Sequence, residues 1–462
     1  MPSLNTTDLD PTPYGRTRAV GGVRLSLKRA GSWASGHPFI WTLLIAAAAL
    51  ATAWLRLPTV ARDTLWAEDG RNFLQDALDL GPLDSLFIPY AGYLHTLPRI
   101  ITALIVGFVP VSSYALAMTA GSCIAGAVIA SIVFVCSRDV VGWIPARVLI
   151  AMVTVLAPLA PREVSGNTAN LHSLVLWTMF WILLYHPRTR VGSYLLALTA
   201  LLGCLTEIQT VFLLPLLLWR LRDRGLKWPR IAYLVGVGVQ LSVSLMWPRG
   251  STTNAAVGLP SILYGFLINS VIPVWIPQND IGPALVWGGL TLCLVLCIPF
   301  VVALFVSVRY GSTVQRVAGF GLLGVALLVY GVAVFDNPNR RYDYATMSNL
   351  ELGSVWLARY GVVPSMMLCA LIPLAASVVV SRAQLPTAPA KLARAAAGVV
   401  TLLLLFMLLL QFGPQETRRS GGPAWSPQIS AARLRCEDMP DSVIILVKET
   451  IGWTVSISCE RL

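Results

Sequence analysis

The 462-residue sequence has little charge: 12% of its residues are acidic or basic, against about 25% in an average soluble domain. The hydrophobic residues, 56% of the chain, come in long uninterrupted runs, each close to the roughly 20 residues that cross a bilayer. The sequence lacks the short alternating segments of a transmembrane β-barrel. The composition therefore predicts an all-α polytopic membrane protein and excludes an ordinary soluble domain.

The sequence also lacks a P-loop, a dinucleotide-binding fingerprint and any metal-type spacing among its eight cysteines. ATP-driven transport by this chain alone is therefore not expected. The net charge of +12 does not indicate nucleic-acid binding, because the basic residues punctuate the apolar runs, as membrane topology requires.

The apolar runs predict about eleven membrane spans. Two short runs are separated only by Thr206 and Glu207 and are expected to form a tight hairpin that does not fully cross. Residues 99–110 are too few to span and fit an interfacial helix. The expected spans are 39–57, 114–136, 144–160, 171–185, 193–206, 208–219, 231–247, 284–308, 317–335, 361–380 and 396–413.

The positions of the basic residues predict the orientation. Residues 1–38 form a polar, basic segment that we expect to be a disordered cytoplasmic tail, and the run Arg220–Arg230 is the strongest inner anchor. The transmembrane domain, 39–413, then has long outer loops at 58–113, 248–283 and 336–360. The location expected is the plasma (inner) membrane, with the chemistry at the outer face.

Residues 414–462 are expected to form a small extracytoplasmic domain that contains β-strands. Residues 443–447 and 453–458 have strand-like patterns and are joined by a hairpin turn. Cys436 and Cys459 flank this pair, and an oxidising outer compartment favours a disulfide between them. The other six cysteines lie in apolar spans as small packing residues.

The candidate catalytic residues are Glu68 and Asp69, adjacent acids in the first outer loop. A carboxylate in a partly desolvated cleft can take the proton from an acceptor hydroxyl. The pair could also hold a divalent metal ion, which is the one cofactor that the sequence suggests. The alternative is structural, since Asp69 precedes a helix-like sequence and can serve as its N-cap.

Polar and aromatic side chains at the other outer turns are candidates for binding the sugar or the acceptor. Asn167 and Asn170 suit sugar hydroxyls, although Asn167 equally suits a helix cap. Glu207 is costly at membrane depth and therefore suggests function. Tyr93 also fits an aromatic belt at the headgroups. The full set is Tyr93, His95, Asn167, Asn170, His172 and Glu207.

Basic residues of the last long outer loop are candidates for binding phosphate. Arg359 is the strongest, because it precedes a span where backbone N–H groups also favour anions. Tyr360 adjoins it, and Arg340 and Arg341 lie earlier in the loop. A snorkelling role at the headgroups is the alternative for Arg359.

These residues resemble those of the integral-membrane GT-C glycosyltransferases, which use polyprenyl-phosphate sugars. The resemblance rests on the acidic pair Glu68–Asp69, on the amphipathic segment before the second span, and on Arg359–Tyr360 followed by Pro364. It covers most of residues 39–413. It implies a GT-C-like fold, an acidic catalytic residue at Asp69 or Glu68 and a basic phosphate contact at Arg359.

The function expected is inverting transfer of a sugar from a polyprenyl-phosphate donor to a cell-envelope glycan, lipid or protein. Two alternatives stay open. A transporter or flippase for a lipid-linked glycan predicts charges buried at mid-membrane and paired half-helices. A non-catalytic envelope-assembly protein would act through its outer tail.

Overall fold

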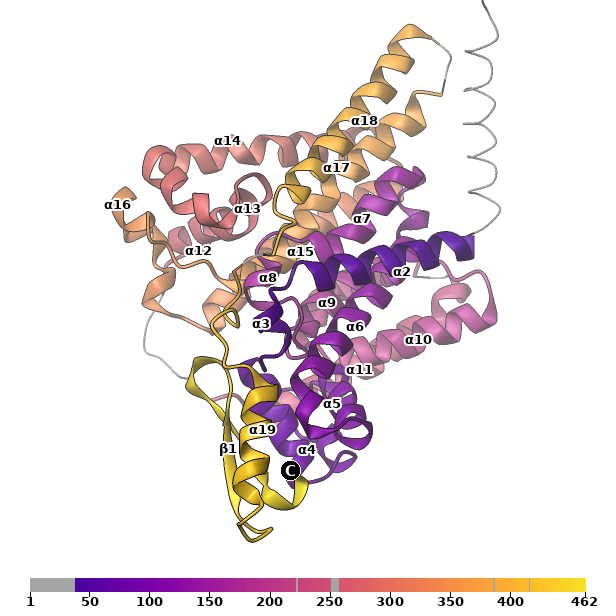
Figure 1. Cartoon of the computed structure of the whole chain (residues 1–462). Coiled ribbons are helices and arrows are strands. Elements are labelled where there is room, and N and C mark those ends of the chain that lie inside the picture. The colour runs from indigo at the N-terminus through magenta and orange to yellow at the C-terminus, as the bar shows by residue number, and fades with distance from the viewer. Residues whose placement is uncertain (1–37, 222, 251–256, 385–386, 415) are drawn as a thin grey trace, which may run out of the picture. The chain divides into compact units, whose positions relative to one another are not determined.

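The structure is a computed structural model that describes residues 38–462 except 222, 251–256, 385–386 and 415. The predicted basic tail, apart from Pro38, lies outside the described residues. The chain divides into two compact units, Met1–Leu44 and Ile45–Leu462. Apart from the first residues of α2 (Pro38–Leu55), the features discussed below belong to the second unit (Figure 1).

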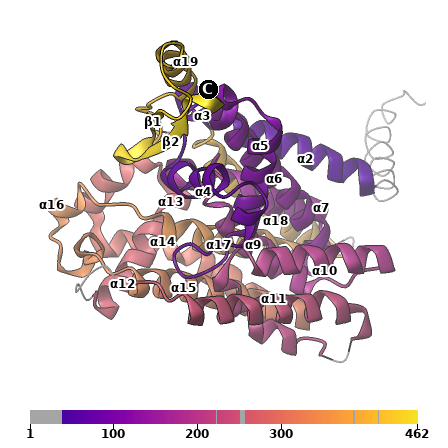
Figure 2. The same ribbon diagram turned by 90° about the horizontal axis from the view of Figure 1, so that it is seen from below.

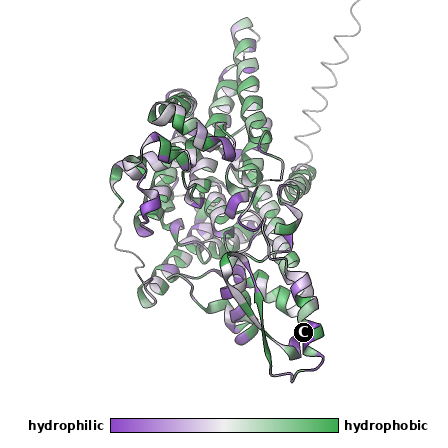
Figure 3. Cartoon of the chain, turned by 60° about the vertical axis from the view of Figure 1, so that its left-hand side comes forward, coloured by the Kyte–Doolittle hydropathy of each residue, from purple (hydrophilic) through white to green (hydrophobic). Residues whose placement is uncertain are grey.

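Seven helical segments of the described residues are long and apolar enough to cross a membrane, which is compatible with a multi-pass membrane protein. Hydrophobic residues run along these helices, as Figure 3 shows. The segments are Val111–Asp139, Ile144–Glu163, Lys227–Met246, Gln278–Tyr310, Thr313–Asp336, Arg359–Arg382 and Ala388–Leu409. Their main helices are, in the same order, α6 (Tyr114–Cys136), α7 (Ile144–Leu156), α11 (Lys227–Met246), α14 (Ile281–Tyr310), α15 (Thr313–Asp336), α17 (Val362–Arg382) and α18 (Ala388–Leu409).

The other four expected spans are helical but shorter, so the structure does not support the count of eleven by length. They are α2 (Pro38–Leu55), α9 (Leu171–Leu184), α10 (Arg190–Cys204) and the 3-10 helix η5 (Ile208–Leu218). A 3-10 helix rises about 2.0 Å per residue and an α-helix about 1.5 Å. Therefore η5, with 11 residues, is about as long as α10, with 15.

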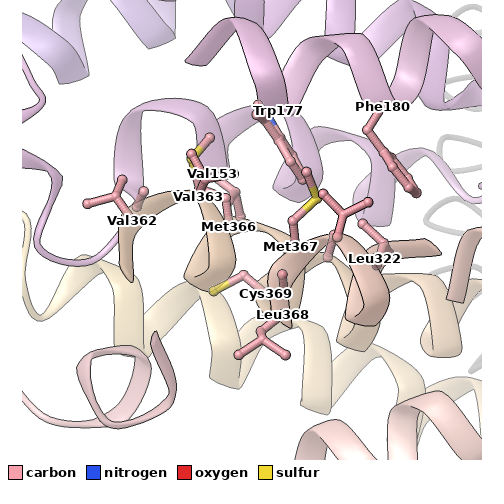
Figure 4. Packing of buried hydrophobic residues seen from close by; sticks show 14 of the residues in the cluster. Val153, Trp177, Phe180, Leu322, Val362, Val363, Met366, Met367, Leu368 and Cys369 are labelled. Carbon is pink, nitrogen blue, oxygen red and sulfur yellow. The ribbon is translucent and has the colours of Figure 1, made fainter. Parts of the chain in front are cut away.

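Helix α17 lies at the centre of the bundle and is buried along almost its whole length. It packs against α7, α9, α14, α15 and α18. An apolar sequence on every side of the helix favours this central position. Figure 4 shows its contacts with neighbouring helices, through Val153, Trp177, Phe180, Leu322, Val362, Val363, Met366, Met367, Leu368 and Cys369.

Polar contacts made by arginine and histidine side chains join the helix ends on one side of the bundle. We call this side the basic end. The pairs are Arg188 with Asp139 at 2.7 Å, His186 with Asp223 at 3.2 Å, and the Arg382 guanidinium with the Tyr310 carbonyl at 3.0 Å. The Trp143 amide donates to the Ser377 hydroxyl at 3.3 Å and the Gln315 side chain to the Val140 carbonyl at 3.1 Å, so the C-terminal ends of α6, α9, α14 and α17 lie on the same side. The start of α17 and the ends of α11 and α15 are at the opposite end of the bundle.

The expected outer loop 248–283 is largely helical, which corrects the sequence analysis. It contains α12 (Leu259–Phe266), the π-helical segment η7 (Leu267–Val271) and α13 (Ile272–Trp275). The run is apolar but too short to span, and its middle is fully buried, from Ile268 to Val274. A short apolar segment in a membrane protein can thus be part of the core.

Short helices fill the remaining connections. They are α3 (Thr59–Arg62), the π-helix η1 (Asp69–Leu74), α4 (Gln75–Asp79), η2 (Asp84–Phe87), α5 (Thr96–Phe108), η3 (Val111–Ser113), η4 (Ser137–Asp139), α8 (Ala160–Glu163), η6 (Arg224–Leu226), η8 (Gln278–Asp280), η9 (Arg340–Tyr342), η10 (Tyr344–Thr346), α16 (Asn349–Leu352), η11 (Arg359–Gly361), η12 (Thr450–Gly452) and η13 (Cys459–Arg461). The segment expected to be interfacial corresponds to α5.

The C-terminal segment contains α19 (Trp425–Cys436) and the strands β1 (Ile444–Lys448) and β2 (Thr454–Ser458). The strands pair antiparallel, with Ile444 opposite Ser458 and Lys448 opposite Thr454. A disulfide joins Cys436 to Cys459, with the two Cα atoms 5.4 Å apart. The expected two-stranded element is therefore present.

This segment packs directly on the first long loop (Figures 1 and 2). Trp425, Ile429, Val447 and Val455 share one buried apolar cluster with Leu65, Leu74, Leu78 and Ile105. Backbone contacts add to this, since the Ala67 amide donates to the Thr450 hydroxyl at 3.0 Å. The C-terminal segment thus belongs to the same compact unit as the bundle.

Candidate functional site

A cavity of about 490 Å³ lies at the end of the bundle opposite the basic end. Its lining comes from the first long loop, the start of α9, the turn between α10 and η5, the ends of α11 and α15, and the start of α17. Part of the lining is apolar and includes Leu241, Val329, Val332 and Ala333, and we call this part the apolar wall. The rest is rich in charged and aromatic side chains, so the cavity is amphiphilic.

Glu68 and Arg359 meet in this cavity, although they are far apart in the sequence. The Glu68 Oε1 and Arg359 Nη1 atoms are 3.7 Å apart. The second Glu68 oxygen, Oε2, is buried and has no hydrogen-bond partner among the described residues. Arg359 also faces Glu163, with Nη1 4.0 Å from Oε2. The cavity is therefore lined by a cation beside a carboxylate that has one buried oxygen without a hydrogen-bond partner among the described residues.

Asp69 has a different environment from its neighbour Glu68, because it does not line the cavity and only 1% of it is exposed. Its carboxylate accepts hydrogen bonds from the Thr168 amide at 3.0 Å, the Thr168 hydroxyl at 2.8 Å and the Ala169 amide at 2.7 Å. Burial raises the pKa of Asp69 to about 6, against these hydrogen bonds, which lower it. In this geometry Asp69 anchors the turn before α9.

His95 lies among aromatic rings on the cavity wall. Its ring centroid is 4.2 Å from that of Tyr93, 5.4 Å from Phe73 and 5.6 Å from Tyr90. Both ring nitrogens are buried without a hydrogen-bond partner in the described part of the chain. Burial, with His172 and Arg99 nearby, holds the pKa of His95 well below its usual value. The ring is therefore neutral and can bind a ligand hydroxyl.

His172 and Glu207 form a hydrogen-bonded pair on the same cavity. The His172 Nδ1 atom contacts one Glu207 oxygen. The other Glu207 oxygen accepts the Gln209 amide at 2.7 Å, and Glu207 is 2% exposed. A carboxylate bound to Nδ1 holds the imidazole in a fixed orientation and leaves Nε2 as the ring nitrogen that a ligand can contact. Glu207 thus orients His172.

Asn167 and Asn170 bind each other and the chain before them. The Asn167 side-chain oxygen accepts from both the Asn170 amide and its side chain, each at 2.9 Å. The Asn170 side chain also donates to the Glu163 carbonyl at 3.1 Å. Asn170 lines the cavity and Asn167 does not. The N-cap residue of α9 is Asn170, so Asn167 is not the helix cap that the sequence left open and instead binds within the turn before the helix.

Asn269, which the sequence analysis does not identify, holds the segment that carries Arg359. Its side-chain oxygen accepts the Ala358 amide at 2.6 Å, and its amide group donates to the hydroxyls of Tyr330 and Tyr344 at 3.1 and 3.2 Å. Gly361 packs so closely that an added Cβ would lie 2.1 Å from the Asn269 carbonyl oxygen. A fully buried asparagine therefore fixes the start of α17.

Of the predicted phosphate-binding residues, Arg359 and Tyr360 line the cavity, whereas Arg340 and Arg341 do not. The second arginine on the cavity is Arg249, with Nη1 3.7 Å from the Asp336 carboxylate. The sequence analysis missed Arg249. Its position directly after a span, in a long outer loop, is the signal that could have found it.

The described residues contain no group of three or more His, Cys, Asp or Glu side chains arranged to hold a metal ion. The Asp69 oxygens already accept three hydrogen bonds, and Glu68 faces a guanidinium. The acidic pair therefore does not form a ligand set for the metal ion that the sequence suggests.

Comparison of the chain with family models, with curated proteins and with solved structures gives no match in any of the three.

Proposed function

We propose that this chain is a membrane glycosyltransferase that moves a sugar from a polyprenyl-phosphate donor to a cell-envelope glycan, lipid or protein. The observation that supports it is the amphiphilic cavity, where an apolar wall adjoins a cation and a free carboxylate oxygen. A lipid phosphate has the same division into an apolar chain and an anionic head. The orientation follows from the basic end, which faces the cytoplasm and leaves the cavity at the outer face of the plasma membrane.

Arg359 binds the donor phosphate in this proposal, and the prenyl chain lies along the apolar wall. Because Glu68 occupies Arg359 before the donor binds, the phosphate displaces Glu68 and leaves its carboxylate unpaired. Glu68 then takes the proton of the acceptor hydroxyl. The acceptor oxygen forms a bond to the anomeric carbon, the bond from that carbon to phosphate breaks, and Arg359 stabilises the departing phosphate.

The sugar is held by the histidines and their neighbours. His95 and His172 each offer a ring nitrogen, and Asn170 lies beside them. Tyr93 and Tyr360 provide aromatic surface on the same cavity. Attack from the side opposite the phosphate inverts the anomeric centre.

The test is transfer by purified protein in maltoside micelles, with a radiolabelled polyprenyl-phosphate sugar. Glu68→Gln and Arg359→Gln should each lower transfer by about 100-fold or more, with unchanged melting temperatures. The matched controls are Glu437→Gln and Arg394→Gln, at exposed positions. Full transfer by Glu68→Gln would remove Glu68 from the mechanism, and transport of an intact donor without a new bond would favour a flippase.

The Asp69→Asn variant distinguishes the role of Asp69 from that of Glu68. The Thr168 amide, the Thr168 hydroxyl and the Ala169 amide all donate to Asp69. The NH2 group of an asparagine would face at least one of these donors, which should lower the free energy of unfolding by about 1–3 kcal/mol. We expect a lower melting temperature for this variant. Loss of transfer by Asp69→Asn without loss of stability would assign the proton acceptor to Asp69 instead.

A further inference from the structure

Trp356 lies at the centre of an arginine cluster beside the cavity. The guanidinium carbons of Arg418, Arg341 and Arg162 are 4.1, 4.6 and 5.5 Å from the centre of its ring system. The three arginines come from the C-terminal segment, from η9 and from α8. Since an aromatic ring has two faces, at least two of the three guanidiniums share one face.

The cluster continues into the cavity through Glu163. One Glu163 oxygen is 2.5 Å from the Arg418 Nε atom, and the other is 4.0 Å from Arg359. Within the described residues, the cluster and the adjoining cavity wall contain four arginines, of which Arg359 and Arg418 pair with the two carboxylates Glu163 and Glu68, whereas the guanidinium groups of Arg162 and Arg341 contact only the Trp356 ring in this cluster. The positive charge exceeds the negative charge by two.

The excess charge has unused hydrogen-bond donors. Arg162 Nε and Arg418 Nη2 are buried and have no partner in the described part of the chain. An aromatic ring offsets a cation by only about 0.5–2 kcal/mol. Guanidinium groups are the side chains that bind phosphate in two-point geometry. An oxyanion would balance the charge and use the free donors.

We propose that Arg162, Arg341 and Arg418 around Trp356 form a second anion subsite, which binds a phosphate group carried by the acceptor. The assignment of this phosphate to the acceptor rests on the proposed function, in which Arg359, on the other side of Glu163, binds the donor phosphate. The phosphate can belong to a lipid headgroup or to a soluble molecule, and the two arms of the test distinguish these sources.

The test measures binding of two probes to the full chain in dodecyl maltoside, which contains no phosphate. Glycerol 3-phosphate is titrated and followed by ³¹P NMR line width, and phosphatidylglycerol binding is counted by native mass spectrometry. Arg341→Gln and Arg162→Gln should each weaken binding of at least one probe about tenfold. Arg341 is exposed, so its variant should fold even if Arg162→Gln does not.

The matched control is Arg340→Gln, which removes the same charge from the neighbouring residue. Among the described residues, Arg340 neither stacks on Trp356 nor lines the cavity, so this variant should bind both probes within twofold of the original protein. The probe that loses affinity identifies the source of the phosphate. If the original protein binds neither probe, or if Arg341→Gln and Arg340→Gln bind them equally, the subsite is overturned.

Neither probe requires a glycosyl donor. If the chain binds a probe in a way that depends on these arginines but shows no transfer activity, the subsite proposal stands and the transferase proposal is rejected. If transfer depends on Arg359 but the Arg341→Gln substitution does not change probe binding, the transferase proposal stands and the subsite is rejected.

Discussion

Gly70 directly follows Glu68 and Asp69 in the first long loop, and the side chain of Glu449 explains why a glycine is needed there. Glu449 follows β1, where the sequence indicates a hairpin turn, yet it is 1% exposed. Its carboxyl lies where a Cβ on Gly70 would be, 1.9 Å from its Oε2 atom. Only glycine at position 70 therefore leaves room for this acid beside Glu68 and Asp69.

The titration of Glu449 should be visible in stability. Burial, then the charge of Asp69, raises its pKa to about 9. At pH values between the ordinary glutamate pKa and this raised pKa, the carboxyl of Glu449 is ionised in the unfolded chain but keeps its proton in the folded chain. The free energy of unfolding therefore falls as pH rises, by up to about 1.4 kcal/mol per pH unit. Glu449→Gln does not titrate. Its melting temperature relative to the original protein should therefore rise from about pH 5 to about pH 8, and a constant difference would contradict this.

At the scale of elements, the π-helical segment η7 places Asn269 against the start of α17. Asn269→Ala leaves the Ala358 amide and two tyrosine hydroxyls without this partner, at a cost of about 1–3 kcal/mol for the buried amide. We expect a lower melting temperature and about tenfold weaker transfer, because Arg359 loses its fixed position.

Ser270→Ala is the control for that substitution. Its hydroxyl is buried and has no partner among the described residues, so its loss should change neither quantity. Equal transfer by the two variants would show that Asn269 does not position Arg359.

Long apolar elements and the small sheet are predictable from the sequence, because each depends on local pattern. The expected span 114–136 coincides with α6, and the expected strands lie within one residue of β1 and β2. The segment Leu259–Trp275 was missed, since its burial depends on neighbours distant in sequence. The site shows the same division: the pattern predicted Glu68 and Arg359 as site residues but not their contact, and it predicted neither the different environments of Glu68 and Asp69 nor the role of Asn269 in holding the segment that carries Arg359.

At the scale of the whole molecule, the C-terminal segment holds the loop that carries Glu68. Arg419 donates to the Thr64 carbonyl at 3.3 Å and to the Ser165 carbonyl at 3.0 Å. Ser426 donates to the Asp63 carboxylate at 2.8 Å. The C-terminal segment is therefore packed on the loop and the bundle through specific hydrogen bonds.

Removal of residues 414–462 should therefore destabilise the loop rather than only abolish partner binding. Trypsin cleavage after Arg62 and Arg71 should become much faster, because the contacts with the C-terminal segment are lost. The double variant Cys436→Ser/Cys459→Ser keeps the segment and should lose only about 2–5 kcal/mol, with slower cleavage than the truncated chain. Equal cleavage of the truncated and complete chains would show that the loop is stable by itself.

The contact between the Ala67 amide and Thr450 joins residues 383 positions apart. Translation therefore delivers Ala67 long before Thr450. A nascent chain that has already inserted its helices still lacks the partners of Thr64, Leu65 and Ala67. The cavity can therefore reach its final form only after the C-terminal segment has been synthesised, and a messenger cut short before this segment would yield a protein that has its long apolar helices but an incomplete site.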